Sequence, residues 1–399
     1  MYYAGGANLP CAARVVNLPG GRGAECRSHA VPVLHCGDIS ASAVKMRLTK
    51  TSTVTIRDVA GKSGVSVTTV SMVLNDAPLA RHIPAKTRDR VKRAAKELGY
   101  RPNLFARSLR SNRSQTLGVV VFDITDPYCT QILRGIEDSL YHSGYLPILT
   151  DIQNKRARFQ RCVELLLDRR VEGVIAIANP LYLESDLLQD FAHREVPTVV
   201  IGRQLAENSL SSVVVDNEAG TFAALEYLHG LGHRKIAFIR GPKALVDSAP
   251  RWKGVCEFAR QAGLKIDPKL VVEIQGGNSS YPVGVELTQE LLNRGREFTA
   301  LVTFDDLTAF AAIGCLSKAG RKVPEDISVV GFDDIPGAGF YNPPLTTVHQ
   351  HLEMQGSIGA EIIRDLVHAR NNNQTMKSLH RRVVPRLVVR QSTAPPRRG

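Results

Sequence analysis

The chain has 399 residues, enough for two or three domains, and a net charge of +13. No stretch reaches the ~18 apolar residues that a membrane-spanning helix needs, which argues against a membrane protein. The charge is uneven, because residues 47–113 hold fifteen Lys or Arg against four Asp or Glu. Such a local excess favours binding to a polyanion, although a solvated helical surface is the alternative.

Residues 1–50 show no periodicity and no apolar signal-peptide segment, so we expect a disordered extension of a cytoplasmic protein. Met46 marks an alternative start. The seven Cys residues show neither Cys-x-x-Cys spacing nor a Cys/His cluster, so we expect no metal and no cofactor. Four isolated Cys residues lie among apolar neighbours and are expected to be buried thiols: Cys129, Cys162, Cys256 and Cys315.

Residues 55–75 predict two short helices joined by a tight turn. Thr55 can cap the first helix, with Asp58 as its reciprocal acid. Gly64 suits the turn because glycine adopts a left-handed backbone at least cost. Ser66 can cap the second helix by accepting from amides two or three residues later. The alternative is an ordinary helical hairpin of a soluble domain.

The second helix has two distinct faces. Its apolar seam comprises Val65, Val70, Val73 and Leu74. The other face presents Val67, Thr68, Ser71 and Met72. A capped helix with short outward side chains can enter a DNA major groove.

A third helix is predicted from Pro84 to Leu98, with Pro84 at its first position and Gly99 ending it. Residues 54–101 would then form a helical head. In the following linker, 102–115, Asn103 can cap a helix over 104–110 that is too short to be stable alone. It would fold on DNA, with Leu109 as an apolar wedge; a solvated tether is the alternative.

From residue 116 to 392 the pattern alternates between strands and helices. The predicted strands are TLGVVVFDI, PILT, GVIAIA, TVVIG, SVVVDN, KIAFIRG, VVEI, ALVTF and ISVVGF. The predicted helices are 128–142, 157–168, 185–193, 219–230, 252–262, 283–293 and 307–319. Two such series in tandem predict an α/β core of two doubly wound parallel-sheet lobes with a cleft between them, followed by a tail, 393–399.

Ligands of such sheets bind beyond the carboxyl ends of the strands. The polar and aromatic residues there are Asp123, Tyr128, Arg203, Asp216, Phe304, Asp305, Asp333 and Asp334. A basic cluster near the end of the chain is attributed to edge strands and tail rather than to a second DNA site: Arg381, Arg382, Arg386, Arg390, Arg397 and Arg398.

Several motifs occur in the order found in the lactose/galactose repressor family of bacterial regulators, which the chain resembles over residues 54–392. They are the helix-turn-helix opening, AKTRDRV, YRPN with Leu109, VVVDN, LGHRKIAFIRGP, VVGFDD and NPPLTTVHQ. The resemblance implies a homodimer that binds near-palindromic operator DNA. It also implies a periplasmic-binding-protein-like core that binds a small effector, often a sugar or nucleoside. Repressor is the family default, and activator remains open.

The resemblance also implies residue roles. The residues expected to contact DNA are Thr55, Arg57, Ser66, Val67, Thr68, Thr69, Ser71, Met72, Asn75, Asn103, Ala106 and Leu109. Those expected around the effector are Asp123, Tyr128, Arg203, Asp216, Arg251, Trp252, Phe304 and Asp333. A carboxylate and a guanidinium can fix vicinal hydroxyls while an aromatic ring covers the apolar side of a sugar. The alternatives are a surface Arg251, a turn-capping Asp333 and a core Trp252.

The chain departs from the family pattern at three places. Met72 stands where many members carry an Arg, and Met cannot make a bidentate contact to guanine. The loop before the third helix, with residues 78–82, is longer than the family pattern. Phe304 stands where some members have an amide side chain. No C-terminal heptad run predicts a tetramerisation helix.

Two other functions fit the sequence less well than regulation. An exported solute-binding protein needs a signal peptide and no basic head, which is the reverse of this chain. An enzyme is not expected, since Gly61-Lys62-Ser63 lacks the upstream glycine of a phosphate-binding loop, where Arg57 stands. His349 and His351 alternate as in a strand rather than a metal site.

Overall fold

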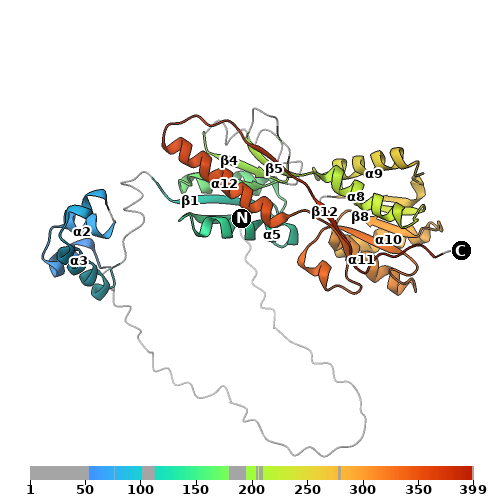
Figure 1. Cartoon of the computed structure of the whole chain (residues 1–399), viewed down its shortest axis with the longest axis horizontal. Coiled ribbons are helices and arrows are strands. Elements are labelled where there is room, and N and C mark those ends of the chain that lie inside the picture. The colour runs from blue at the N-terminus through green and yellow to red at the C-terminus, as the bar shows by residue number, and fades with distance from the viewer. Residues whose placement is uncertain are drawn as a thin grey trace, which may run out of the picture. The chain divides into compact units, whose positions relative to one another are not determined.

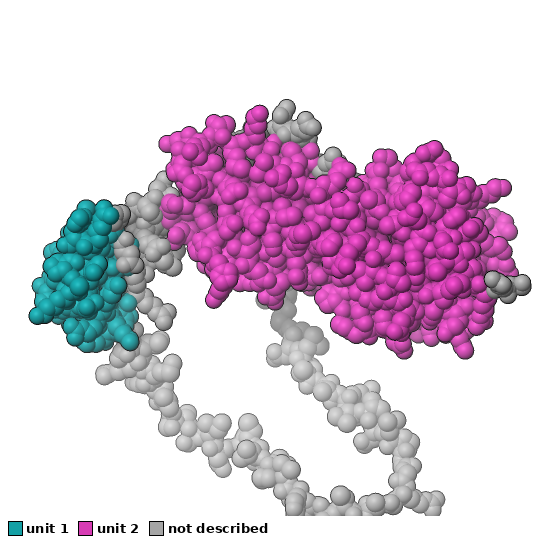
Figure 2. All heavy atoms as spheres, in the orientation of Figure 1, with its two compact units in different colours: residues 1–101 teal, residues 102–399 magenta. Residues whose placement is uncertain are grey.

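The computed structural model describes residues 54–397 except 76, 101–112, 179–194, 204, 206–209 and 277–279. The chain divides into two compact units, residues 1–101 and 102–399, coloured separately in Figure 2. The expectations for residues 1–50, for the short helix 104–110 and for the helix 185–193 lie outside the described residues. Within the described ranges, none of the helices is both long and apolar enough to cross a membrane.

The first unit is a three-helix head with one small core. Its elements are α1 (Ile56–Ser63), α2 (Val67–Leu74), the 3-10 helix η1 (Pro78–His82) and α3 (Ala85–Leu98). The buried core residues are Val59, Ala60, Val70, Val73, Val91, Ala94 and Ala95. Val65, Leu74 and Leu98 pack against this core, so the apolar faces predicted from the sequence are confirmed.

The ends of these helices follow local rules. The Asp58 carboxylate accepts from both the amide and the hydroxyl of Thr55, each at 2.7 Å. Gly64 has φ +62°, and the Ser66 hydroxyl accepts from the amide of Thr69, so the predicted turn and second cap are confirmed. Pro84 differs from expectation: it is the N-cap of α3, because its ψ of 139° is extended rather than helical.

The second unit contains two lobes, each built on a six-stranded sheet (Figure 1). The lobe 1 sheet is parallel throughout and has the order β11-β5-β4-β3-β1-β2. Its strands are β1 (Thr116–Val121), β2 (Leu146–Asp151), β3 (Gly173–Ile177), β4 (Thr198–Ile201), β5 (Ser211–Val215) and β11 (His380–Val383). Its described helices are α5 (Pro127–Tyr141), α6 (Arg156–Asp168) and α12 (Leu352–Asn371).

The lobe 2 sheet has the order β12-β10-β9-β8-β6-β7, with only the β10–β12 pair antiparallel. Its strands are β6 (Ile236–Arg240), β7 (Val271–Glu273), β8 (Ala300–Thr303), β9 (Ser328–Asp333), β10 (Thr346–His349) and β12 (Arg386–Val388). Its helices are α8 (Asn217–Gly230), α9 (Ser248–Ala262), α10 (Tyr281–Asn293) and α11 (Asp306–Lys318), with 3-10 turns η2 (Pro268–Leu270) and η3 (Pro336–Gly339).

Alternate residues of a lobe 2 strand enter different cores. Ile236 and Phe238 of β6 join the cluster formed with α8 and α9. Ala237 and Ile239 join the cluster formed with α10 and α11. Because both faces of the sheet are buried, its strands read as continuous apolar runs. The predicted fold class is confirmed.

The order of the chain through the lobes differs from the two tandem series expected. After β10 the chain returns to lobe 1 as α12, then adds β11 to that sheet and β12 to lobe 2. The chain therefore crosses between lobes three times, after β5, β10 and β11. Helix α12 was not predicted from the sequence. Arg381 and Arg382 on β11, and Arg386 on β12, do lie on edge strands, as expected.

Helices α5 and α12 pack with their backbones in close approach. A methyl group at Gly135 would lie 1.8 Å from the carbonyl oxygen of Glu353, and one at Gly356 would lie 2.1 Å from that of Ile132. Glycine is thus required at both positions. The buried-thiol expectation holds for Cys129 and Cys315 but is wrong for Cys256, which is exposed on α9; Cys162 is half-buried.

Candidate functional site

The outward face of α2 carries both polar and apolar side chains. Val67 is 40% exposed and Thr68 is also exposed, while Ser71 and Met72 are half-buried. The Ser66 and Thr69 hydroxyls lie 2.9 Å apart, and the Asn75 side chain donates to the carbonyl oxygen of Ser71 at 2.8 Å. The predicted DNA-contacting polar residues near the ends of α2 therefore also hold its backbone in place.

The head carries many exposed cations. These are Arg57, Lys62, Arg81, Lys86, Arg90, Lys92, Arg93 and Lys96. Lys62 pairs with Glu97 at 2.8 Å, and both side chains are exposed, so this pair contributes little to stability. The predicted hinge residues Asn103, Ala106 and Leu109 lie outside the described residues.

A cavity lies between the two lobes, and its empty space of about 490 Å³ includes open solvent at its mouth. We call it the interlobe cavity. Lobe 1 lines it with Phe122, Asp126, Pro127 and Tyr128; lobe 2 contributes Leu245, Arg251, Phe304, Asp305, Leu307, Asp333 and Ile335. Four predicted effector residues thus meet here: Tyr128, Arg251, Phe304 and Asp333.

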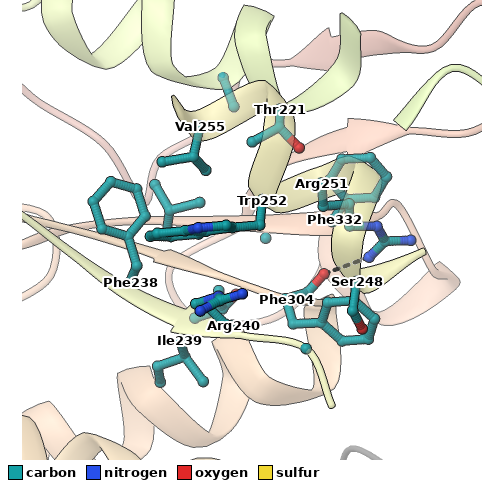
Figure 3. A pocket seen from close by; sticks show the side chains of 15 residues that line it. Thr221, Phe238, Ile239, Arg240, Ser248, Arg251, Trp252, Val255, Phe304 and Phe332 are labelled. Carbon is teal, nitrogen blue, oxygen red and sulfur yellow. Dashed lines mark hydrogen bonds between the residues drawn. The ribbon is translucent and has the colours of Figure 1, made fainter. Parts of the chain in front are cut away.

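The other four predicted effector residues lie elsewhere. Arg203 and Asp216 line a neighbouring cavity with Asp247 and Arg382, beside the chain crossings. Asp123 accepts from the amide and hydroxyl of Thr125 and does not line the interlobe cavity. Trp252 lines a third pocket within lobe 2, where Figure 3 shows it beside Phe238 and Arg240.

Arg251 on α9 organises the lobe 2 wall. Its side chain is only 8% exposed, so the surface-residue alternative is wrong. Its Nε donates to Asn217 at 2.9 Å. Its Nη1 donates to the Phe304 carbonyl oxygen at 2.5 Å (Figure 3). Its Nη2 lies 3.4 Å from Asp333 Oδ1 and 3.6 Å from Asp247 Oδ2. The guanidinium also stacks on the rings of Phe304 and Phe332, at 4.5 and 3.8 Å from their centroids.

Asp333 ends β9 in an unusual backbone conformation, with φ +118°. Its Oδ1 accepts from Arg251 and from Gln350, a fully buried side chain that sequence reasoning missed. The amide of Ile335 donates to Asp306 instead, which leaves the turn-capping role without support. Burial raises the pKa of Asp333 well above its usual range, and Arg251 opposes this rise.

Two further carboxylates line the cavity: Asp126, which the sequence did not point to, and Asp305, which it placed at a strand end but not among the expected effector residues. Asp126 caps α5 by accepting from the Tyr128 amide, and Asp305 caps α11 by accepting from the Thr308 amide. Burial, reinforced by Asp305 and Asp123, raises the pKa of Asp126 to about 6. The cap of α5 could have been predicted from the sequence, because an Asp followed by Pro127 is typical of a helix start.

Tyr128 presents an unused polar atom. Its side chain is 5% exposed, and its buried hydroxyl has no hydrogen-bond partner in the described part of the chain. Burial raises the pKa of this phenol further above its usual value, so the group stays neutral and can donate. No group of three or more His, Cys, Asp or Glu side chains suited to a metal occurs among the described residues.

Two family models match separate parts of the chain. Residues 55–103 match the family model described as bacterial regulatory proteins, lacI family, and residues 225–393 match a periplasmic binding protein-like domain. The transcriptional repressor PurR of Pasteurella multocida is 32% identical over 340 residues, 85% of this chain and 98% of PurR. The repressor CytR of Escherichia coli is 32% identical over 297 residues, 74% and 84% of the two chains.

Solved structures agree. The Lac repressor dimer bound to operator and the anti-inducer ONPF has a TM-score of 0.73 at 29% identity, covering 86% of this chain and 99% of that one. The regulator CelR in complex with cellobiose has a TM-score of 0.63 at 32% identity, covering 85% and 99%. These relatives are DNA-binding regulators, which supports neither a solute-binding protein nor an enzyme. By sequence and by fold, the chain belongs to the lacI family of bacterial regulatory proteins.

Proposed function

We propose that this protein is a homodimeric repressor whose head reads operator DNA in the cytoplasm, at the nucleoid, and whose interlobe cavity binds a sugar or nucleoside effector. The observation that carries the proposal is the presence, in one chain, of a capped helix-turn-helix and a cavity lined from both lobes. A ligand that contacts both lobes stabilises one arrangement of them, which is the requirement for an effector-driven change.

In the head, α2 would lie in the major groove. Val67, Thr68 and Met72 would face bases, and the half-buried Met72 would read its base by apolar contact. The backbone contacts would come from Thr55, Arg57, Ser66, Thr69, Ser71 and Asn75. The exposed cations support this role, because each phosphate that they neutralise releases counterions and makes binding salt-dependent. Salt-insensitive binding to every duplex tested would contradict it.

The segment between the units would act as a hinge, with Asn103 and Ala106 beside the Leu109 wedge in the minor groove. We expect Leu109→Gly to weaken binding to operator more than binding to random duplex, because only the specific complex would fold the hinge. Fluorescence anisotropy on both duplexes measures this. Equal losses on the two would argue against a wedge.

In the core, Tyr128, Arg251, Phe304 and Asp333 would hold the effector, with Arg203 and Asp216 at the adjoining cavity. Asp123 accepts a hydrogen bond from Thr125 in its own loop, and Trp252 packs against Phe238. Because neither lines the interlobe cavity, both are secondary candidates. The structures of relatives with ONPF and with cellobiose support a glycoside-like ligand. Effector binding would close the two lobes on each other. This closure would change the distance between the two hinges of the dimer.

The test combines ligand and operator. A thermal-shift screen of sugars and nucleosides should identify a stabilising ligand, since saturation at a hundred times Kd adds about 2.7 kcal/mol to stability. That ligand should change operator affinity, and operator should change ligand affinity by the same factor. Identical operator isotherms with every stabilising ligand would remove the allosteric part of the proposal.

A further inference from the structure

The polar groups of the interlobe cavity are mainly acceptors. We infer that this cavity selects ligands that bring hydrogen-bond donors and no negative charge, so that a free sugar or a nucleoside binds and its phosphate ester is rejected. This inference rests on the proposed effector role of the cavity. It concerns the charge that the site tolerates, which neither the fold nor the relatives determine.

Among the described residues, one cation lines the cavity, Arg251, and its contacts are all made within the protein. Arg251 gives its three nitrogens to Asn217, the Phe304 carbonyl oxygen and the carboxylates of Asp333 and Asp247. Phe304 and Phe332 stack against the guanidinium. A phosphate would have to displace these contacts to reach the fork of donors that usually binds it.

The helix N-termini at the cavity are also occupied. The start of a helix attracts anions through its free amides. Here Asp126 fills that position on α5 and Asp305 fills it on α11, each with one carboxylate oxygen, Oδ1. A phosphate would therefore meet a carboxylate at each helix start.

The same two carboxylates offer acceptors from opposite lobes. Each uses Oδ1 for its cap, and its Oδ2 has no hydrogen-bond partner among the described residues. Both carboxylates line the cavity, and the negative charge of Asp305 raises the pKa of Asp126. A ligand that donates to both would relieve this repulsion and hold the lobes together.

Tyr128 independently points to a ligand. Its buried hydroxyl lacks a hydrogen-bond partner among the described residues, and a buried polar group is unfavourable while it stays unpaired. The remaining lining is apolar, with Phe122 and Phe304 among the aliphatic Leu245, Leu307 and Ile335. The combination of acceptors, one hydroxyl and apolar surface fits an uncharged ring with vicinal hydroxyls.

The experiment uses pentoses, hexoses and nucleosides, each paired with its monophosphate, in titration calorimetry on the full chain at pH 8. At this pH the phosphate carries close to two negative charges and Asp126 is ionised. For the free ligand that binds, we expect its ester to bind at least ~10-fold more weakly, because like charges repel strongly at a buried site. An ester that binds as tightly as its free partner would overturn the inference.

Variants test the cause. The double variant Asp126→Asn with Asp305→Asn keeps both caps, since Asn caps helices as well as Asp. It should bring the affinities of ester and free ligand closer by ~10-fold. Asp138→Asn, on the exposed side of α5, should leave their ratio unchanged. An unchanged ratio in the double variant would overturn the stated cause.

Operator binding, measured in parallel, separates a failure of this inference from a failure of the proposed effector role. If operator affinity responds to esters only, the effector role stands and the inference fails. If no member of any pair binds or alters operator affinity, the effector role falls and the inference with it.

Discussion

At the scale of single residues, the negative charge of Asp126 is unfavourable in the folded protein. The pKa of Asp126 rises from 3.8 to about 6, chiefly because burial disfavours its charged form. A carboxyl group whose pKa is raised by folding stabilises the protein only while it is protonated. Its contribution is complete below about pH 4 and is lost as the pH rises through 6.

We therefore expect Asp126→Asn to stabilise the chain at pH 8 by on the order of 1–3 kcal/mol, and to have no such effect near pH 4. The cap on α5 is retained, because Asn accepts from the same amide. Urea unfolding across this pH range measures the difference, with Asp138→Asn as the control. Destabilisation at pH 8 would show that the carboxylate is not strained.

Arg251 makes hydrogen bonds, ion pairs and ring contacts in the lobe 2 wall of the interlobe cavity. Arg251→Lys should cost about 2–4 kcal/mol, because one ammonium cannot replace a stacked fork that serves several acceptors. Trp252 is the only Trp in the chain and lies in lobe 2, so its fluorescence reports the unfolding of that lobe. The exposed Arg260→Lys on the same helix is the matched control. Equal stabilities of the two variants would contradict the role given to Arg251.

At the scale of elements, the contact of α5 with α12 depends on glycine. We expect Gly356→Ala to destabilise lobe 1 by about 1–3 kcal/mol, since the new methyl group meets the backbone oxygen of Ile132. Gly230→Ala on α8 meets nothing within 4 Å and should be neutral or stabilise by up to about 1 kcal/mol. Thermal unfolding compares the two, and similar melting temperatures would rule out the close approach as a constraint.

At the scale of the whole molecule, the edge strand β2 is an exposed apolar surface. Leu146 is 64% exposed and Leu149 42%, and Tyr141 at the end of α5 is 74% exposed. An exposed apolar edge strand is a surface on which another chain can pack. Since relatives are dimers on operator DNA, we propose that a second copy of this chain covers it.

We expect Leu149→Asp to convert the dimer into monomers in sedimentation experiments. Operator affinity should then fall by roughly 10²–10⁴-fold, because the two heads would no longer bind as a linked pair. Asn293→Asp adds the same charge on lobe 2 and should leave both properties unchanged. A stable Leu149→Asp dimer would place the interface elsewhere.

The sequence by itself determined features that depend on neighbours a few residues apart. The caps at Thr55 and Ser66, the turn at Gly64 and the continuous apolar strands all follow from short-range chemistry, and all were predicted. The helix α12 was missed although its buried residues follow a helical period, because two glycines, Gly356 and Gly359, weaken its intrinsic helical preference.

Only the tertiary structure decided which residues share a site. Asp126 and Asp305 meet because two sheets place the ends of β1 and β8 at one cavity, and Gln350 reaches Asp333 because the chain crosses between lobes there. Arg203 and Asp216 belong to the adjoining cavity for the same reason. Contacts between residues so far apart along the chain depend on the packing of whole lobes, which no local pattern encodes.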